Sequence, residues 1–334
     1  MKLALVRLSS LGDIIFCMAV LQIIKRNRPD ISVTWFADKK FADILDYNPD
    51  LEHVVKIELK DLKRDFSFSG LKREYSNLLE WGRFDVVIDM HGMLKSAVIS
   101  RLVGGRIYGF HKNTAKEPLT SLLYGTALDI PLEINTVYRY ASLVAQALDI
   151  PLTEEELVYK QPFLFYGDSD AAYTAEYFCE DQKNIILVVG STWESRNYPK
   201  DKFVSIANSL QGNILICYGN DTEFQTAQYI AERSSFVRIL PKMNLNQLKA
   251  AISQADLVIG GDTGPTHIAW ANNIPCIVIF GPTPAHRIYP NATCRILKSS
   301  SVVDDRKLDR NDFSIREISE LQVIELAVEL LSGV

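Results

Sequence analysis

The sequence GGDTGPTH at Gly260–His267 decides how the C-terminal half of the chain is interpreted. It ends the largely apolar run Ala255–Ile259, which predicts a buried parallel strand, and it opens Pro265–Ala271, which predicts a short helix. A strand that passes through such a loop into a helix places free backbone N–H groups at the carboxyl edge of a sheet, where phosphate binds. Gly and Asp are also common in ordinary strand–helix turns, so this stretch alone leaves both interpretations open.

A second loop of this kind lies near the N-terminus. Ser9-Ser10-Leu11-Gly12-Asp13 follows a predicted strand, Leu3–Leu8, and precedes the apolar stretch Ile14–Ile24. Its Gly permits a tight turn, and its Asp stands at the start of a predicted helix. The first loop offers phosphate donors and this one offers a carboxylate. The two together predict a two-domain enzyme in which both halves contribute loops to one active site.

The composition is that of an ordinary globular protein. The 334 residues favour two domains, with 47% hydrophobic and 23% charged residues. The net charge of −5 argues against a general nucleic-acid-binding protein. Five cysteines without C-x-x-C spacing predict reduced thiols in a cytosolic protein. The run Ile14–Ile24 contains Gln22 and is too short to span a bilayer.

Predicted strands and helices alternate along the whole chain, which indicates parallel sheets with helices on both faces. The predicted strands are Leu3–Leu8, Ser32–Phe36, Val54–Leu59, Asp85–Met90, Ile107–Phe110, Asn184–Gly190, Asn213–Tyr218, Val237–Leu240, Leu257–Gly261 and Cys276–Phe280. The predicted helices are Ile14–Asn27, Lys40–Tyr47, Leu71–Trp81, Leu94–Leu102, Asp170–Cys179, Lys202–Leu210, Thr222–Arg233, Leu245–Ala255, Pro265–Ala271 and Ile315–Leu331.

Each half is therefore predicted to be a doubly wound α/β domain. We place the domains at 1–165 and 166–312, since the boundary region Ile150–Lys183 holds prolines and the acidic run Glu154-Glu155-Glu156. The final segment, 313–334, is predicted to be a helix that packs back on the N-terminal domain.

Four loops of the C-terminal half carry polar groups at the ends of predicted strands. Besides Gly260–His267, these are Gly190-Ser191-Thr192 with Arg196 close behind, Tyr218–Glu223, and Gly281-Pro282-Thr283. Hydroxyls and a guanidinium suit a phosphate, and an acidic residue suits ribose hydroxyls. Each loop is also compatible with helix capping alone, but four at one edge favour a nucleotide site.

Asp13 has two interpretations. A carboxylate at the end of a strand can accept a proton from a substrate hydroxyl, and Asp is also a favoured N-cap. The five histidines show no metal-ligand spacing. Asp168-Ser169-Asp170 matches a D-x-D metal pattern, but it precedes a predicted helix, where capping explains it. We expect no essential metal. A basic segment, Lys56–Arg73, is either a solvated loop or the mouth for an anionic acceptor near a membrane.

These motifs together resemble the ADP-heptose:lipopolysaccharide heptosyltransferases, glycosyltransferase family 9. The resemblance covers nearly the whole chain, and one stretch is most like the heptosyltransferase I group. The motifs that carry it are SSLGD at 9–13, DMHGMLKS at 89–96, TAKEPL at 114–119, LPKM at 240–243, GDTGPTH at 261–267 and FGPT at 280–283. The family has the GT-B fold, in which two Rossmann-like domains face each other across a cleft.

The resemblance implies an inverting, metal-independent transfer without a cofactor. L-glycero-D-manno-heptose would pass from ADP-heptose to a Kdo (3-deoxy-D-manno-oct-2-ulosonic acid) residue of lipid A, at the cytoplasmic face of the inner membrane, where the protein would be peripheral. Asp13 would be the base. The implied donor-binding residues are Ser191, Thr192, Arg196, Glu223, Met243, Asp262, Thr263, Gly264 and His267. The implied acceptor-binding residues are Ser10, Gly12, Lys60, Lys63, Arg64, Lys95 and Lys116.

Three alternatives stay open at this point. The first is transfer to a heptosyl acceptor, as in heptosyltransferase II, and the second is a GT-B-like UDP-sugar epimerase, which needs no acceptor patch. The third is a nucleotide-binding module without catalysis. The chain also departs from the family pattern, which often has Lys at the position of Arg196 and two threonines at Ser191-Thr192.

Overall fold

A computed structural model describes residues 1–58, 78 and 80–333 of the chain. The chain divides into two compact units, Met1–Phe163 and Leu164–Val334. The predicted boundary between 165 and 166 lies beside this division. Lys60, Lys63, Arg64 and most of the predicted helix Leu71–Trp81 lie outside the described residues.

The described part of the N-terminal unit is built on a parallel sheet with the strand order β3-β2-β1-β4-β5-β6. The strands are β1 (Lys2–Val6), β2 (Ser32–Asp38), β3 (His53–Ile57), β4 (Val86–Asp89), β5 (Arg106–Phe110) and β6 (Thr126–Leu128). Because β1 pairs with both β2 and β4, the order reverses at β1. In open α/β sheets, ligands bind beyond the carboxyl ends of the strands at such a reversal.

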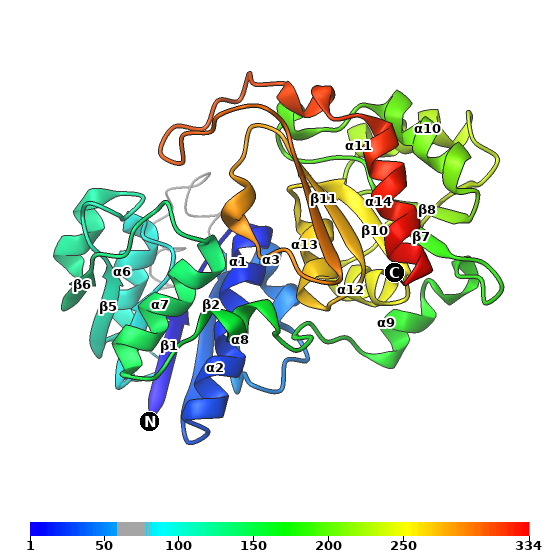
Figure 1. Ribbon diagram of the computed structural model, residues 1–334. Helices are drawn as coiled ribbons and strands as arrows, with labels where there is room; N and C mark the ends of the chain where they lie inside the picture. The colour runs from blue at the N-terminus through cyan, green and yellow to red at the C-terminus, as the bar shows by residue number, and fades with distance from the viewer. Residues whose placement is uncertain (59–77, 79, 334) are drawn as a thin grey trace. The chain divides into compact units, whose positions relative to one another are not determined.

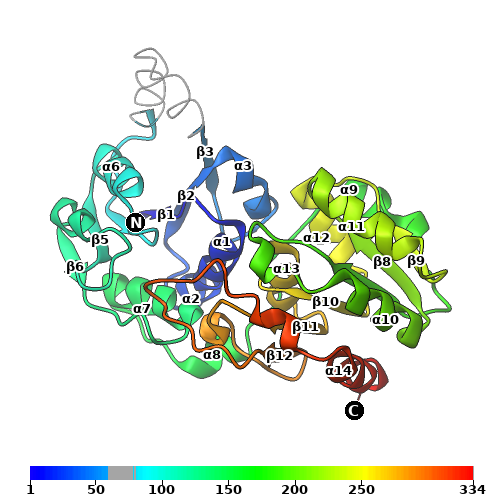
Figure 2. The ribbon, with the colours of Figure 1, turned by 90° about the horizontal axis from the view of Figure 1, so that it is seen from above.

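Helices cover both faces of this sheet (Figures 1 and 2). The core on one face joins Ala4 and Val6 of β1 to Ala97 and Val103 of α6. On the other face α1 and α2 pack against α7. The helices are α1 (Leu11–Met18), α2 (Val20–Asn27), α3 (Lys39–Ala42), α6 (Leu94–Val103), α7 (Thr136–Leu148) and α8 (Glu154–Val158), with 3-10 turns η1 (Asp43–Leu45) and η2 (Pro118–Leu123).

The C-terminal unit repeats this plan with the order β9-β8-β7-β10-β11-β12. Its strands are β7 (Asn184–Val188), β8 (Asn213–Cys217), β9 (Val237–Ile239), β10 (Leu257–Gly261), β11 (Cys276–Phe280) and β12 (Cys294–Lys298). Its helices are α9 (Asp168–Ala172), α10 (Lys200–Leu210), α11 (Asp221–Ala231), α12 (Leu245–Ser253), α13 (Gly264–Ala271) and α14 (Glu320–Ser332), with 3-10 turns η3 (Ala175–Tyr177), η4 (Glu194–Arg196), η5 (Ala285–Arg287) and η6 (Ser314–Glu317). Here the order reverses at β7 and β10.

The last helix differs from the expectation that it packs on the N-terminal domain. Its buried residues, Val323 and Ala327, belong to the core of the C-terminal unit, and α14 packs against α10 (Figure 1). The apolar face predicted for this segment is therefore buried against its own unit. Gly281 allows the segment before α14 to pass close to the chain after β11, because a Cβ at Gly281 would lie only 2.6 Å from the Cβ of Ile315.

Several elements differ from the predicted ones. The predicted helix Ile14–Asn27 starts earlier, at Leu11, and its hydrogen-bond pattern breaks at Ala19, although Ala19 keeps helical angles (φ −56°, ψ −24°). Helix α7 was not predicted, although its buried residues Val137, Tyr140, Ala141, Val144 and Leu148 recur at helical spacing. The edge strands β6 and β12 were not predicted either. The first has only three residues, and the second is mostly half-buried and carries Arg295 and Lys298.

Candidate active site

Asp13 lies in the first turn of α1, directly beyond the carboxyl end of β1. Its Oδ2 accepts hydrogen bonds from the backbone N–H of Ser10 (3.2 Å) and from the Ser10 hydroxyl (2.8 Å). Asp13 is thus the third residue of the helix and half of a capping box with Ser10, not the N-cap itself. Gly12 lies beside it in the same turn. Because capping fixes one carboxylate oxygen, it orients the side chain and is compatible with catalysis.

A buried arginine completes this arrangement. The Nη2 of Arg7 lies 2.9 Å from Asp13 Oδ2, and its Nη1 donates a hydrogen bond to the carbonyl of Met90 (2.6 Å). Burial by itself would lower the pKa of Arg7, but the nearby Tyr140 and Asp13 raise it above the ordinary value. Arg7 therefore stays charged and forms a close ion pair with the Asp13 carboxylate.

His91 follows β4 and lies next to the end of β1. Its Nδ1 accepts a hydrogen bond from the backbone N–H of Leu8 (3.1 Å), so the ring proton sits on Nε2. Burial, together with the charges of Arg7 and Lys95, lowers the pKa of His91 to about 2. The imidazole is therefore neutral at physiological pH. The charge of Lys116 also acts on the pKa of this ring. The loop that carries Lys116 contacts the loop after β4, because the Glu117 N–H donates to the Gly92 carbonyl (3.0 Å).

A buried carboxylate holds the loop after β4 in place. Asp89 accepts hydrogen bonds from the N–H of His91 (2.8 Å), the Ser96 hydroxyl (2.8 Å) and the Tyr124 hydroxyl (2.9 Å). Burial raises the pKa of Asp89. Glu117 then ties the next loop to α6, because its Oε2 accepts from the Leu94 N–H (2.6 Å). These bonds position Lys95 and Lys116 at one edge of the sheet.

The C-terminal unit has its own charged cluster at the reversal between β7 and β10. Asp262 follows β10 and is 2% exposed. Its Oδ1 lies 2.8 Å from His267 Nε2 and 3.7 Å from Arg287 Nε, and its Oδ2 accepts from Arg196 Nη1 (3.2 Å). Arg196 also donates to the Thr192 hydroxyl (3.2 Å). Two guanidiniums therefore converge on one buried carboxylate, directly before α13.

The charges of this cluster follow from its surroundings. Burial would raise the pKa of Asp262, but Arg287, His267 and Arg196 together hold it well below the ordinary range. Burial lowers the pKa of His267, although Asp262 opposes that shift. With His267 neutral, two arginines face one carboxylate, and the cluster keeps an excess positive charge. The backbone N–H groups at the start of α13, at Thr263 and Gly264, add to this positive potential.

Glu223 lies in the first turn of α11, directly after the loop that follows β8. Its Oε2 accepts from the Gly219 N–H (2.7 Å) and its Oε1 from the Asn220 side chain (2.7 Å). The side chain passes directly over Gly190, where a Cβ would lie 2.3 Å from Glu223 Cγ. Gly190 therefore allows the loops after β7 and β8 to approach each other.

Two other predicted donor residues, Ser191 and Met243, lie in loops of the C-terminal unit. The Ser191 hydroxyl donates to the Trp193 carbonyl (2.9 Å), which shapes the loop that carries Thr192. Met243 is half-buried in the loop before α12. Asp170 caps α9 by accepting from the Gly167 N–H (3.1 Å), as expected for that D-x-D segment.

Three functional candidates were not singled out from the sequence. Arg7 is hidden inside an apolar strand pattern, and His91 was considered only as a metal ligand. Arg287 lies four residues beyond the Gly281-Pro282-Thr283 loop. A charged residue in an apolar strand that leads into a Gly-containing loop is the signal that would have revealed Arg7. Arg287 has no comparable local signal, since its partner is distant in the sequence.

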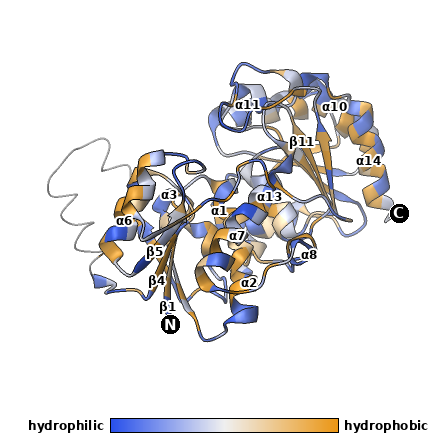
Figure 3. Ribbon diagram, turned by 60° about the vertical axis from the view of Figure 1, so that its left-hand side comes forward, coloured by the Kyte–Doolittle hydropathy of each residue, from blue (hydrophilic) through white to orange (hydrophobic). Residues whose placement is uncertain are grey.

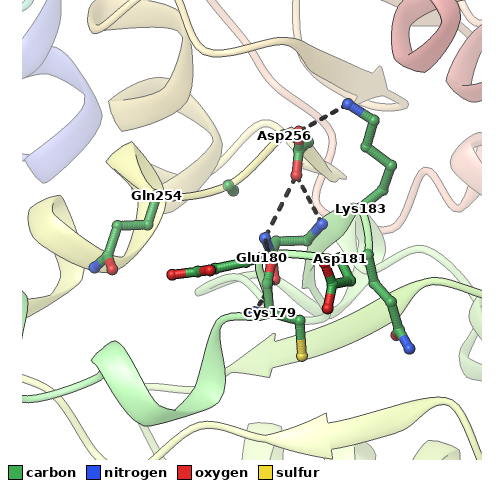
Figure 4. Close-up of a pocket in the computed structure, with 9 residues that line it drawn as sticks. Cys179, Glu180, Asp181, Lys183, Gln254 and Asp256 are labelled. Carbon is green, nitrogen blue, oxygen red and sulfur yellow. Dashed lines mark hydrogen bonds and ion pairs between the residues drawn. The ribbon is translucent and has the colours of Figure 1, made fainter.

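A polar pocket of about 420 Å³ lies at the opposite edge of the C-terminal sheet (Figure 4). Asp256 holds it together by accepting from the Asn184 N–H (2.8 Å) and by pairing with Lys183 (3.1 Å). None of the predicted site residues lines this pocket. It stands at the amino ends of β7 and β10, where α/β sheets do not usually bind substrates.

Within residues 1–58, 78 and 80–333, no three His, Cys, Asp or Glu residues gather in a way that suits a metal ion. Likewise, none of the helices in these ranges has the length and apolar character needed to cross a bilayer. The expectation of a metal-independent reaction stays a prediction.

Comparison with known proteins identifies the family. The model of glycosyltransferase family 9 (heptosyltransferase) matches residues 73–308. The chain belongs to glycosyltransferase family 9. It is 33% identical to a lipopolysaccharide heptosyltransferase 1 of Campylobacter coli over 343 residues, which cover 99% of both chains. Membership makes the chain a glycosyltransferase, so the epimerase and non-catalytic alternatives are set aside.

Solved structures confirm the predicted fold. The E. coli heptosyltransferase WaaC with ADP matches 99% of this chain and 100% of its own, with a TM-score of 0.81 and 23% identity. The same enzyme with ADP-2-deoxy-2-fluoro heptose matches with a TM-score of 0.78, 22% identity and coverage of 98% and 99%. The two parallel sheets therefore form the two Rossmann-like halves of a GT-B glycosyltransferase.

Proposed function

We propose that this glycosyltransferase moves L-glycero-D-manno-heptose from ADP-heptose to a Kdo residue of lipid A in the synthesis of the lipopolysaccharide inner core. The similarity to the Campylobacter coli heptosyltransferase 1 supports the sugar and the pathway. The observation that carries the proposal is the pair of arginines on Asp262 at the start of α13, a site suited to a diphosphate.

In the proposed reaction the acceptor hydroxyl loses its proton to Asp13. The hydroxyl oxygen then bonds to the anomeric carbon of the heptose as the bond from that carbon to the β-phosphate oxygen breaks. Attack from the face opposite ADP inverts the configuration. ADP leaves with an additional negative charge, which Arg196, Arg287 and the N–H groups of α13 stabilise. These protein groups supply the stabilisation that a metal ion would otherwise give.

Asp262 has a positioning role in this scheme. The family resemblance assigns it to the heptose hydroxyls, but both of its oxygens are engaged, with His267 and Arg287 on Oδ1 and Arg196 on Oδ2. We propose that its first task is to hold the two guanidiniums in place for the diphosphate. The chain then binds the donor with two arginines fixed by one buried carboxylate.

The acceptor half is proposed to bind an anionic lipid head group. Lys95 and Lys116 flank His91 beside Asp13, and Arg7 adds buried positive charge. An acceptor with carboxylates and phosphates suits this set. Peripheral contact with the cytoplasmic face of the inner membrane follows from a lipid acceptor. Transfer to a heptosyl acceptor remains the second candidate, because the donor half serves both reactions equally.

The test is a transfer assay with purified protein, ADP-heptose and Kdo-bearing lipid A in the presence of EDTA. We expect ADP release and an acceptor mass increased by one heptose. ADP release without a mass gain would mean hydrolysis and a different acceptor. Transfer only to an acceptor that already carries heptose would favour the second candidate. Activity that disappears with EDTA and returns with a divalent cation would contradict the metal-independent mechanism.

Replacing Gly190 by Ala is expected to weaken ADP binding, although the substitution itself removes no ligand-binding side chain. The new Cβ would displace Glu223, which is proposed to hold the ribose hydroxyls. Loss of hydrogen bonds to a charged group costs about 1.5–3 kcal/mol, or roughly a tenfold to hundredfold rise in Kd.

Calorimetric titration with ADP measures this effect. Glu223→Ala should weaken binding to a similar degree, and the double variant should add little to either change. Gly219→Ala is the control, since a Cβ there meets Glu223 only at 3.4 Å. Additive losses in the double variant would mean that Gly190 acts independently of Glu223.

A further inference from the structure

Four exposed apolar side chains lie together on the N-terminal unit, on α6 and η2. Leu94 and Val98 of α6 are 42% and 48% exposed, and Leu119 and Leu122 of η2 are 63% and 79% exposed. The two elements pack against each other, and the Glu117 carboxylate joins them through the Leu94 N–H. We call these four side chains the apolar ridge. Large apolar residues that gather in this way on a surface mark an interaction site.

The ridge is not explained by the packing of its own helix. Residues Ala97 and Val103 on the inner side of α6 already contact the sheet. Leu94, Val98 and Arg101 follow one another at four and three residues, so they share the outer face. Figure 3 shows hydrophobic and hydrophilic residues alternating along α6. The helix therefore has an inner apolar face for the core and an outer face that combines apolar and cationic residues.

The charge around the ridge is opposite in sign to that of the whole chain. Residues 94–124 contain five Lys or Arg and one acidic residue, Glu117, although the protein has a net charge of −5. Arg101, Lys112 and Lys116 are exposed. Glu117 is already engaged with the Leu94 N–H. Exposed leucines rimmed by cations are the combination that binds anionic bilayers, by apolar insertion and electrostatic attraction together.

We propose that the apolar ridge and its cationic rim dock the enzyme on the anionic surface of a lipid bilayer. The ridge adjoins the candidate active site, since the Glu117 N–H at the start of η2 donates to the carbonyl of Gly92 (3.0 Å), the residue directly after His91. Docking through the ridge would bring the site around Asp13 to the membrane, where a lipid acceptor presents its head group. The inference rests on the proposed function and deepens it by assigning a membrane contact to this surface.

The first test is cosedimentation with vesicles of phosphatidylethanolamine and phosphatidylglycerol, and with vesicles of phosphatidylcholine alone. We expect binding to the anionic vesicles only, weakening as salt rises. The double variant Leu119→Asp/Leu122→Asp should bind at least about tenfold more weakly, because two apolar side chains are lost from the contact. Arg101→Glu should weaken binding less and flatten its salt dependence.

The matched control is Leu321→Asp on α14, where the leucine is 65% exposed in the other unit. This variant should bind vesicles as the unmodified protein does. Equal binding by the ridge variant and the control would overturn the proposal, as would no vesicle binding by the unmodified protein. A ridge variant that changes only the oligomeric state in solution would overturn it too, since the ridge would then join copies of the chain.

Activity separates this inference from the proposed function on which it rests. The ridge variant should transfer heptose to a detergent-dispersed acceptor at the unmodified rate but lose transfer to an acceptor embedded in anionic vesicles. Equal transfer by the ridge variant to both acceptors would overturn the docking surface alone. Transfer to neither acceptor by the unmodified protein would overturn the proposed reaction, while vesicle binding would still test the ridge.

Discussion

Replacing Asp13 by Asn is expected to lower kcat for heptose transfer about a thousandfold, within the range typical for loss of a general base. Asn has nearly the same size, and its Oδ1 can still accept from the Ser10 N–H and hydroxyl, so the start of α1 should keep its fold. What is lost is the carboxylate that the Arg7 guanidinium contacts at 2.9 Å. The acceptor hydroxyl then has no base, and the barrier to its attack rises.

Two measurements make this prediction specific to catalysis. Calorimetric titration with ADP-heptose should give the same Kd for the variant and the unmodified protein, because the proposed donor residues belong to the other unit. Asp38→Asn is the matched control, since Asp38 also stands at the carboxyl end of a strand of this sheet and caps a helix through the Lys40 N–H (3.0 Å). It should retain transfer. Undiminished turnover in Asp13→Asn would assign the base to another residue.

The arrangement of strands was predictable because local sequence signals agreed with the fold. Runs such as Leu257–Gly261 and Cys276–Phe280 are apolar throughout, as strands buried on both faces must be, and their predicted bounds are those of β10 and β11. The failures are equally physical. The edge strand β6 has only three residues, which is too short for a run or an alternation of apolar residues to identify it.

The site could be predicted only as far as its residues belong to loops that end strands. Asp262 stands in such a loop, and Asp13 and Arg196 stand in the helical turns that follow such loops. The parallel topology brings the loops after β7 and β10 together. What the sequence did not contain is the pairing across the cluster. That Arg287 reaches Asp262, or that Arg7 reaches both Met90 and Asp13, depends on the three-dimensional path of distant segments.

Replacing Asp262 by Asn is expected to destabilise the C-terminal unit and to weaken donor binding. The variant would leave Arg196 and Arg287 facing each other with the carboxylate charge removed from a site only 2% exposed. Removing one partner of a buried ion pair costs about 3 kcal/mol of unfolding free energy. The guanidiniums would also lose their fixed orientation, so Kd for ADP-heptose should rise at least about tenfold.

Urea unfolding and calorimetric titration measure the two effects. Asp256→Asn is the matched control, because Asp256 also accepts a backbone hydrogen bond and pairs with a cation, but at the opposite edge of the same sheet (Figure 4). It should bind ADP-heptose normally. Tighter donor binding by Asp262→Asn would contradict the positioning role, since the carboxylate would then act only by repelling the diphosphate.

The pH dependence of this stability difference tests the electrostatic explanation. Because the folded pKa of Asp262 lies well below its ordinary value, its contribution is present above the unfolded pKa of about 3.9 and is lost only as pH falls through the folded value. The stability difference between the unmodified protein and Asp262→Asn should therefore be the same at about pH 8 and about pH 5.5. A difference that shrinks across this interval would mean that the carboxylate takes up a proton there, and the two arginines would not be holding it ionised.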